Sequence, residues 1–410
     1  MNNSIDEFVE KIGAGKSSYN MKKRNIPLSV PNLDLDILPY IRETIETGWV
    51  STGGRFITEF EDKVKDFIDA DFTRGVQSGT AGLHLSLLAL GLQPGDEVIV
   101  PTLTFIAAVN PVYYSHAYPV FMDCADDLNI DSLKLHTFLT EECTFENGIV
   151  VNKKSGRKIK GIVVVHVFGN PVDMEAIMKI AEEYNLFVLE DASEALGSKY
   201  TEGKYAGKHC GTIGDLGVLS FNANKIITTG GGGMIIAPTE EMADRISFLA
   251  TQAKTDPWRF IHDEVGYNYR MTNIAAAFGV SQIDKIEQFL TTKSNNYFRY
   301  KTVFHEHGMK ILDFNEGTNP NYWFYSLMID EKEFGMNKEA LMLKLMDYGI
   351  QTRPIWGLIH QQKPYLEHQA YQIEKALYYA DKVLNIPCST NLTTDDLDFV
   401  VKTILSLKKN

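Results

Sequence analysis

Short runs of apolar residues alternate with stretches of helical periodicity through the first two thirds of the chain. The stretch 173–184, for example, spaces its apolar residues along one helix face. Runs compatible with buried strands lie at 96–101, 118–123, 161–169, 186–191 and 216–221. Buried strands separated by amphipathic helices indicate a mostly parallel sheet that is covered on both faces. The pattern therefore predicts an α/β domain.

Two further helices are predicted near the start of this region. Phe56, Phe60 and Val64 recur at steps of four residues, which marks an amphipathic helix over 56–68. Residues 78–91 predict a second helix, which a glycine closes.

After about residue 285 the pattern changes to long helices with few strands. We therefore expect an N-terminal extension at 1–24, a large α/β domain at 25–285 and a smaller α+β domain at 286–410.

A basic segment at 145–162 interrupts the strand pattern. Turn signals at 147–148 and 154–157 flank a short apolar strand, which predicts a β-hairpin. Its cations are Lys153, Lys154, Arg157, Lys158 and Lys160. One interpretation is a solvated hairpin whose charges protect a sheet edge, and the other is a patch for an anionic ligand or partner.

Composition narrows the function classes. The 410 residues are 44% hydrophobic and 23% charged, as in an ordinary globular protein, and the net charge of −13 argues against sequence-independent nucleic-acid binding. We see no signal peptide and no apolar run that could span a membrane, so we expect a cytoplasmic protein. The four cysteines are too scattered for a metal site or a disulfide framework, and we expect neither.

Two residues at predicted strand ends could carry chemistry. Asp191 closes the strand at 186–191, and Lys225 follows the strand at 216–221 in a loop. A carboxylate there can hold a cationic ring nitrogen, and a lysine can form a Schiff base with an aldehyde cofactor. Both residue types are also ordinary in turns, so the flanking sequence has to decide.

Two glycine-containing segments could be taken for phosphate-binding sites. Gly79 and Thr80 begin the helix at 78–91, where backbone N–H groups and a hydroxyl could hold a phosphate, although a plain N-cap fits as well. The run from Gly230 to Gly233 lacks a following GK[ST] motif and leads into an apolar strand. We expect a tight turn there rather than a phosphate loop.

Several longer blocks are characteristic, among them TGWVSTGG, QSGTAGLHLSLLALGLQPGDEVIVP, EDASEALGS, SFNANKIITTGGGG, GYNYRM and RPIWGLIHQQKPY. On these blocks the chain from about Ile26 onward resembles the DegT/DnrJ/EryC1/StrS family of pyridoxal-phosphate-dependent nucleotide-sugar aminotransferases. The resemblance implies the α/β fold of aminotransferase fold type I, with a mostly parallel central sheet between helices and a smaller C-terminal α+β domain. It also implies pyridoxal 5′-phosphate (PLP) as the cofactor.

The resemblance assigns the two candidates roles in catalysis. Lys225 would bond covalently to PLP and later move the proton, whereas some relatives carry histidine there and catalyse dehydration. Asp191 would lie under the pyridinium nitrogen and favour its protonated form. Glu194 would lie beside the cofactor, where many relatives have histidine or glutamine, and its role stays open.

Other cofactor contacts follow from the same resemblance. Gly79, Thr80 and Ser220 would contact the phosphate, and Phe105 would stack on the ring. Asn268 would reach the phosphate from the neighbouring subunit, which implies a homodimer with shared active sites.

Substrate contacts are the least defined expectation. Trp49 and Ser51 would lie near the sugar, and Arg353 and His360 near the site. His166 would lie near the cofactor, although a histidine that ends a buried strand is also ordinary as a structural residue. Basic groups for a diphosphate are expected at Arg55, Arg259 or the hairpin at 153–160.

The expected reaction moves an amino group from L-glutamate to a nucleotide-linked keto sugar. The resemblance is strongest to the branch that aminates UDP-4-keto-6-deoxy-N-acetylglucosamine for surface glycans, with GDP-4-keto-6-deoxymannose, the perosamine route, as the alternative. A PLP-bound regulator and another fold type I enzyme, such as a cysteine desulfurase, are the remaining alternatives. The first lacks a DNA-binding segment, and the second lacks a recognisable catalytic cysteine loop.

Overall fold

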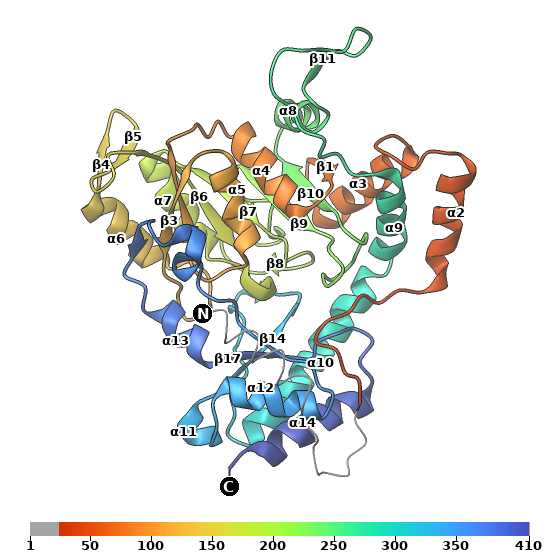
Figure 1. The fold of residues 1–410 in the computed structure, drawn as a ribbon, viewed down its shortest axis with the longest axis vertical. Helices are drawn as coiled ribbons and strands as arrows, with labels where there is room; N and C mark the ends of the chain where they lie inside the picture. The colour runs from red at the N-terminus through yellow and green to blue at the C-terminus, as the bar shows by residue number, and fades with distance from the viewer. Residues whose placement is uncertain (1–23, 410) are drawn as a thin grey trace.

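The computed structural model describes residues 24–409 (Figure 1), so all of the expected extension at 1–24 except Arg24 lies outside them. A ten-stranded sheet in the order β1-β10-β9-β7-β6-β2-β3-β16 fills the upper body, with β4 and β5 attached through β6. Its strands are β1 (Phe72–Val76), β2 (Glu97–Pro101), β3 (Tyr118–Met122), β4 (Cys143–Glu146), β5 (Ile149–Asn152), β6 (Lys158–Val165), β7 (Phe187–Asp191), β9 (Leu216–Ser220), β10 (Gly233–Ala237) and β16 (Ala370–Tyr371).

The sheet is mostly parallel, as predicted. The strands β9, β7, β6, β2 and β3 are parallel to one another, and β10 runs antiparallel between β1 and β9. The strand β1 was not predicted, because Arg74 and Gly75 break its apolar pattern at the sheet edge.

Helices cover both faces of the sheet. One hydrophobic cluster joins the sheet to α4 (Gly79–Ala89), α5 (Asn110–Tyr114) and α8 (Glu240–Ala250). The other joins it to α3 (Arg55–Ile68), α6 (Ser132–Glu142), α7 (Met174–Tyr184) and α9 (Asn273–Ile283). These two layers confirm the predicted α/β class, and α2 (Leu38–Glu46) lies outside them, next to α9 (Figure 1).

The predicted hairpin is confirmed at one edge of the sheet. The strands β4 and β5 pair antiparallel around Asn147 and Gly148, and β5 continues the ladder onto β6. The strand β6 begins at Lys158, three residues before the expected start, because it also pairs with the hairpin.

A smaller body lies below the sheet in Figure 1. It contains α10 (Ile286–Glu306), α11 (Glu331–Phe334), α12 (Lys338–Asp347), α13 (Lys375–Lys382), α14 (Thr394–Leu407) and an antiparallel sheet of β14 (Tyr325–Met328), β17 (Val383–Ile386) and β15 (Arg353–Pro354). The short pair β8 (Lys199–Tyr200) and β13 (Thr318–Asn319) links it to the upper body.

Two segments cross the expected boundary at residue 285, which remains a prediction. Ile26 pairs with Ile350 of the smaller body, and β16 adds to the large sheet beside β3. A residue near the start of the described chain thus belongs to the smaller body, and a late segment, β16, belongs to the large sheet.

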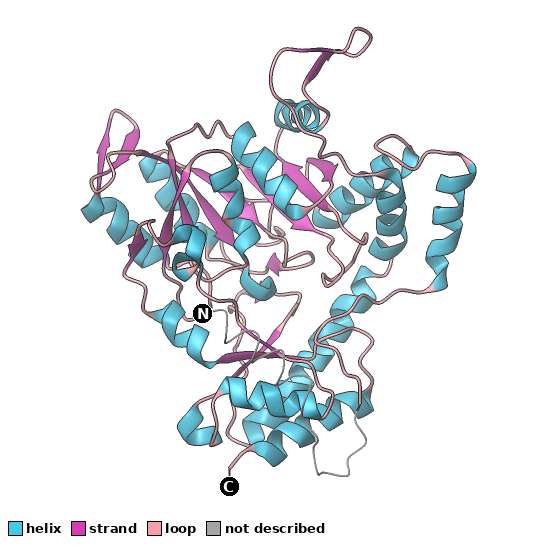
Figure 2. Ribbon diagram, in the orientation of Figure 1, coloured by secondary structure: helices cyan, strands magenta, loops and turns pink. Residues whose placement is uncertain are grey.

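A two-stranded arm of β11 (Lys254–Asp256) and β12 (Ile261–His262) projects from the upper body (Figure 2). It carries three well-exposed apolar side chains, Trp258, Phe260 and Val265, and the Trp258 side chain is 91% exposed. Within residues 24–409, none of the helices combines the length and the apolar character that crossing a membrane would require.

Candidate active site

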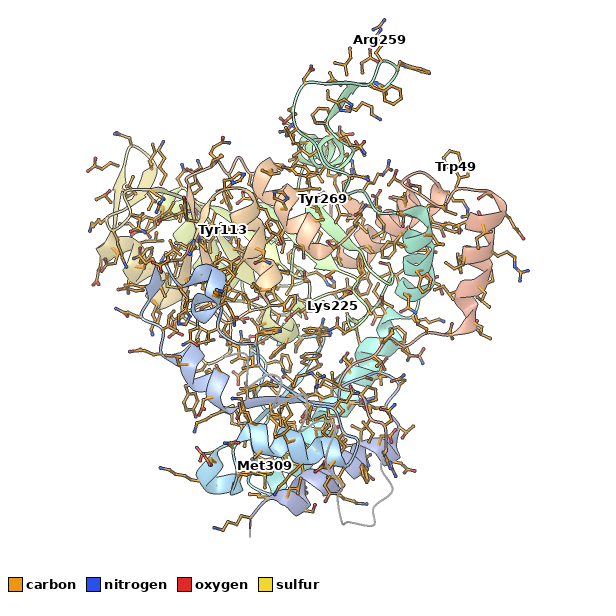
Figure 3. The ribbon with its side chains drawn as sticks, viewed as in Figure 1. Trp49, Tyr113, Lys225, Arg259, Tyr269 and Met309 are labelled. Atoms are coloured by element: carbon orange, nitrogen blue, oxygen red, sulfur yellow. The ribbon has the colours of Figure 1, made fainter. Side chains whose placement is uncertain are left out.

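A cavity of about 370 Å³ lies at the carboxyl ends of β7 and β9, where open α/β sheets place their ligands. Its size falls within the usual range of small-molecule sites, about 300–1,000 Å³. Figure 3 shows Lys225 between the large sheet and the smaller body. Of the residues predicted to hold a cofactor, the structure brings seven together around this cavity: Gly79, Thr80, Phe105, Asp191, Glu194, Ser220 and Lys225.

The beginning of α4 forms one end of the cavity. Ser78 caps the helix by accepting the N–H of Ala81 at 3.1 Å. The N–H groups of Gly79 and Thr80 have no hydrogen-bond partner within the described part of the chain. Free N–H groups at a helix N-terminus attract anions, so this end suits a phosphate.

Two glycines make this end of the cavity, which we call the anion cradle, narrow. A Cβ atom at Gly79 would lie 3.0 Å from the Ser193 hydroxyl and from Cβ of Ser220, so glycine lets the helix start approach both loops. A Cβ atom at Gly233 would lie 2.7 Å from the backbone of Ser78 and Gly79. The chain turns at Gly230–Gly233, as predicted, and enters β10 directly against the anion cradle.

Lys225 lies in the loop that follows β9, and its side chain is 13% exposed. Its Nζ lies 3.6 Å from Oε1 of Glu194. Burial lowers the pKa of Lys225, and the negative charges of Glu194 and Asp191 partly offset that effect. A lowered pKa increases the fraction of free amine, the form that attacks a carbonyl carbon.

Both buried carboxyl groups of the cavity are held by backbone N–H groups. Asp191 accepts the N–H of Ser193 at 3.0 Å, and Glu194 accepts the N–H of Phe168 at 2.8 Å. Burial raises the pKa of Asp191 and raises the pKa of Glu194 to about 7. A cation placed beside Asp191 would stabilise its ionised form.

These groups fit PLP. The free N–H groups of α4 suit its phosphate, Asp191 suits a protonated ring nitrogen, and Lys225 supplies the amine. The Phe105 side chain, at the cavity wall and 54% exposed, offers a flat apolar face.

An aromatic wall from the smaller body closes the cavity. Trp323, Phe324 and Trp356 line it, and the rings of Trp323 and Phe324 stack at 4.0 Å. The sequence interpretation missed Trp323 and Phe324, and Trp356 lies within the characteristic block RPIWGLIHQQKPY. The only signal was a cluster of aromatic residues at 322–325, which is also typical of a core.

The expected substrate residues do not line the cavity of their own chain. The side chains of Ser51 and Arg353 are exposed, and that of Trp49 is 62% exposed. Nδ1 of His360 lies 2.6 Å from the hydroxyl of Thr102. Their substrate roles stay predictions. Asn268 is exposed as well, as a residue offered to a neighbouring subunit would be.

The structure places His166 in the core next to Asp191, whose carbonyl accepts the His166 N–H at 3.2 Å. The side chain is fully buried, and its Nδ1 accepts the N–H of Val172 at 3.0 Å while Nε2 lies 2.9 Å from Glu190. Both ring nitrogens are therefore occupied within the core, with the proton on Nε2 facing the carboxylate. The ring itself does not line the cavity, and a role of His166 in binding stays a prediction.

The expected basic groups lie away from the cavity. Arg55 is paired with Glu43 at 2.6 Å and with Glu59 at 2.7 Å. Arg157 of the hairpin covers the ring of Tyr118 at 3.9 Å. Arg259 is at the tip of the projecting arm (Figure 3), where its guanidinium pairs with Asp256 at 3.0 Å.

Comparison with known proteins agrees with this geometry. Residues 31–405 match the DegT/DnrJ/EryC1/StrS aminotransferase family. The chain is 34% identical over 381 residues to a GDP-perosamine synthase of Escherichia coli O157:H7, covering 92% of this chain and 97% of that protein. It is 33% identical over 387 residues to a GDP-perosamine synthase of Vibrio cholerae, covering 94% and 98%. The structure of the aminotransferase TlmJ from Streptoalloteichus hindustanus is similar, with a TM-score of 0.82, 27% identity, and coverage of 94% of this chain and 99% of that one.

Proposed function

Since the chain belongs to the DegT/DnrJ/EryC1/StrS aminotransferase family, we propose that it moves the amino group of L-glutamate to a nucleotide-linked 4-keto-6-deoxy sugar. The enzyme is a PLP-dependent sugar aminotransferase, and one observation carries the proposal. Lys225, Asp191 and the free N–H groups of α4 surround a single cavity.

Each group of the cavity would have a separate role in the reaction. When bound, PLP supplies an electron-withdrawing ring that stabilises negative charge on the carbon next to the transferred nitrogen. Asp191 would hold the ring nitrogen, and the start of α4 would hold the phosphate. Lys225 would bond to the cofactor in the resting enzyme. Once free, its Nζ can accept and return a proton, because burial keeps its pKa below the ordinary value.

The relatives support the GDP-linked sugar better than the UDP-linked sugar that the sequence blocks suggested first. Both relatives named above are GDP-perosamine synthases and align over nearly their whole length. We therefore take GDP-4-keto-6-deoxymannose as the first candidate acceptor and UDP-4-keto-6-deoxy-N-acetylglucosamine as the second.

A homodimer with shared sites is part of the proposal. Lys225 is the only cationic side chain that lines the cavity in residues 24–409, although a cofactor phosphate and a sugar diphosphate must both be bound. The exposed Asn268 and the arm with Arg259 are available to a second copy. In a dimer, such groups would complete the partner's cavity.

A panel of substrates tests the proposal. The purified enzyme would be incubated with PLP, L-glutamate and GDP-, UDP- or dTDP-linked 4-keto-6-deoxy sugars, and the product identified by mass and NMR. We expect one nucleotide to be strongly preferred, with guanosine first. The matched control is Lys225→Ala. No amino sugar from any acceptor would contradict the proposal.

A further inference from the structure

The segment Asn321–Phe324 connects the smaller body to both loops that hold the active-site charges. Asn321 is 1% exposed, and its amide nitrogen donates to the carbonyls of Glu194 at 2.8 Å and Leu196 at 2.9 Å. Its amide oxygen accepts the N–H of Trp323 at 3.0 Å. The segment is thus fixed against the loop that carries Glu194.

Trp323 contacts the lysine loop in two ways. Its indole N–H donates to the carbonyl of Asn224, the residue before Lys225, at 2.8 Å. Nζ of Lys225 lies 3.9 Å from the centre of its ring, within the range of a cation–π interaction. One side chain therefore restrains both the backbone and the amine of the lysine.

A second lysine lies behind the tryptophan. Lys293 of α10 is 2% exposed, and its Nζ donates to the carbonyls of Trp323 at 2.5 Å and Cys388 at 2.6 Å. Burial lowers the pKa of Lys293, and no carboxylate among the described residues offsets that effect. A buried amine whose contacts are backbone carbonyls fixes the position of those carbonyls, since moving either one would leave a buried polar group without its partner.

We propose that Trp323 is a positioning residue for Lys225, and that Lys293 holds Trp323 in place from the smaller body. This inference rests on the proposed role of Lys225 as the PLP lysine. The ring face stabilises the ammonium form at a fixed location, and the indole N–H fixes the loop from which the side chain extends.

Three variants and one control separate positioning from packing. Trp323→Phe keeps a weaker ring face and loses the indole N–H, and Trp323→Leu loses both. Lys293→Met removes the donor behind the ring. Trp356→Phe is the matched control, because Trp356 lines the same cavity in a separate loop.

The measurement uses the protein without PLP. Acetylation of Lys225 by acetic anhydride would be followed by mass spectrometry from pH 6 to 11, which gives the pH midpoint of the amine without substrate or turnover. We expect the midpoint to fall in the order wild type, Trp323→Phe, Trp323→Leu, because the ammonium loses its ring partner. Lys293→Met should lie below wild type, and Trp356→Phe should match wild type.

Two results would overturn the inference: an unchanged midpoint in Trp323→Leu, or a raised one, which would mean that the ring only excludes water. Melting curves would show that each variant is folded, and Trp323→Phe still decides if Trp323→Leu does not fold. Since the labelling needs no sugar, failure of the proposed amino transfer would not alter its outcome.

Discussion

The carboxyl group of Glu194 lies 3.6 Å from the amine of Lys225, and both groups line the same cavity as Asp191. Three ionisable groups thus share one cavity, with one possible positive charge among them.

Lys225→Ala removes the only amine that lines the cavity within residues 24–409. We expect PLP to bind without a covalent bond and amino transfer to fall by several orders of magnitude, because both the bond and the proton acceptor are lost. Borohydride reduction followed by mass spectrometry measures the bond. Cofactor still attached to the chain after reduction would contradict the assignment, and Lys204→Ala on the surface is a suitable control.

Glu194→Gln removes the charge nearest to Lys225. The pKa of Glu194 is about 7, so in the wild type its negative charge is present mainly above pH 7 and raises the pKa of the lysine there. Above pH 7 the variant should contain more free amine and attach PLP faster, and below about pH 6 the two proteins should agree. Each unit of pKa lowering gives about tenfold more free amine at a pH below the pKa.

Attachment rates at a series of pH values, trapped by borohydride, measure this effect. Equal rates for the variant and the wild type at pH 8 would exclude the charge coupling. Glu202 is exposed, and its substitution Glu202→Gln provides the control.

Asp191→Asn keeps the shape of the residue and removes its charge. PLP should still bind, but the protonated ring nitrogen loses its partner, and the rate of amino transfer should fall by about two orders of magnitude or more. The half-reaction with L-glutamate alone, followed by absorbance, measures this rate. A half-reaction as fast as that of the wild type would assign the carboxylate to the scaffold.

The shared site can be tested by mixing two inactive variants. Asn268→Asp should bind PLP poorly, because it would place a carboxylate against the phosphate, and Lys225→Ala lacks the amine. In a mixed dimer one of the two sites would combine an intact lysine with an intact asparagine, so about a quarter of the wild-type activity should return in an equal mixture. If mixed dimers form and stay inactive, Asn268 serves its own subunit or only the fold.

From the residues alone, Asp191, Lys225, Gly79 and Thr80 are candidates, and the family resemblance supplies the expected cofactor roles of all seven predicted residues that line the cavity. Asp191 ends β7 and Lys225 follows β9, and the carboxyl ends of neighbouring parallel strands meet at one edge of the sheet. The start of α4 reaches the same edge through β1.

The wall from the smaller body could not be predicted in this way. Trp323 contacts Lys225 across 98 positions of sequence, through tertiary packing that no local pattern encodes. His166 shows the opposite difficulty, since a strand end predicts proximity to the site but not the direction of the side chain. Its partner Glu190 lies on the neighbouring strand, inside the core.

The contact between Gly233 and the backbone of Ser78 and Gly79 involves no side chain on the glycine. The strand β10 pairs with β1 on one side and β9 on the other, so the sheet holds Gly233 against the start of α4. The loss of conformational freedom in the cradle occurs when the chain folds and not when a phosphate arrives. Phosphate binding at this end of the cavity therefore loses little free energy to the ordering of a loop, which favours high affinity and slow release.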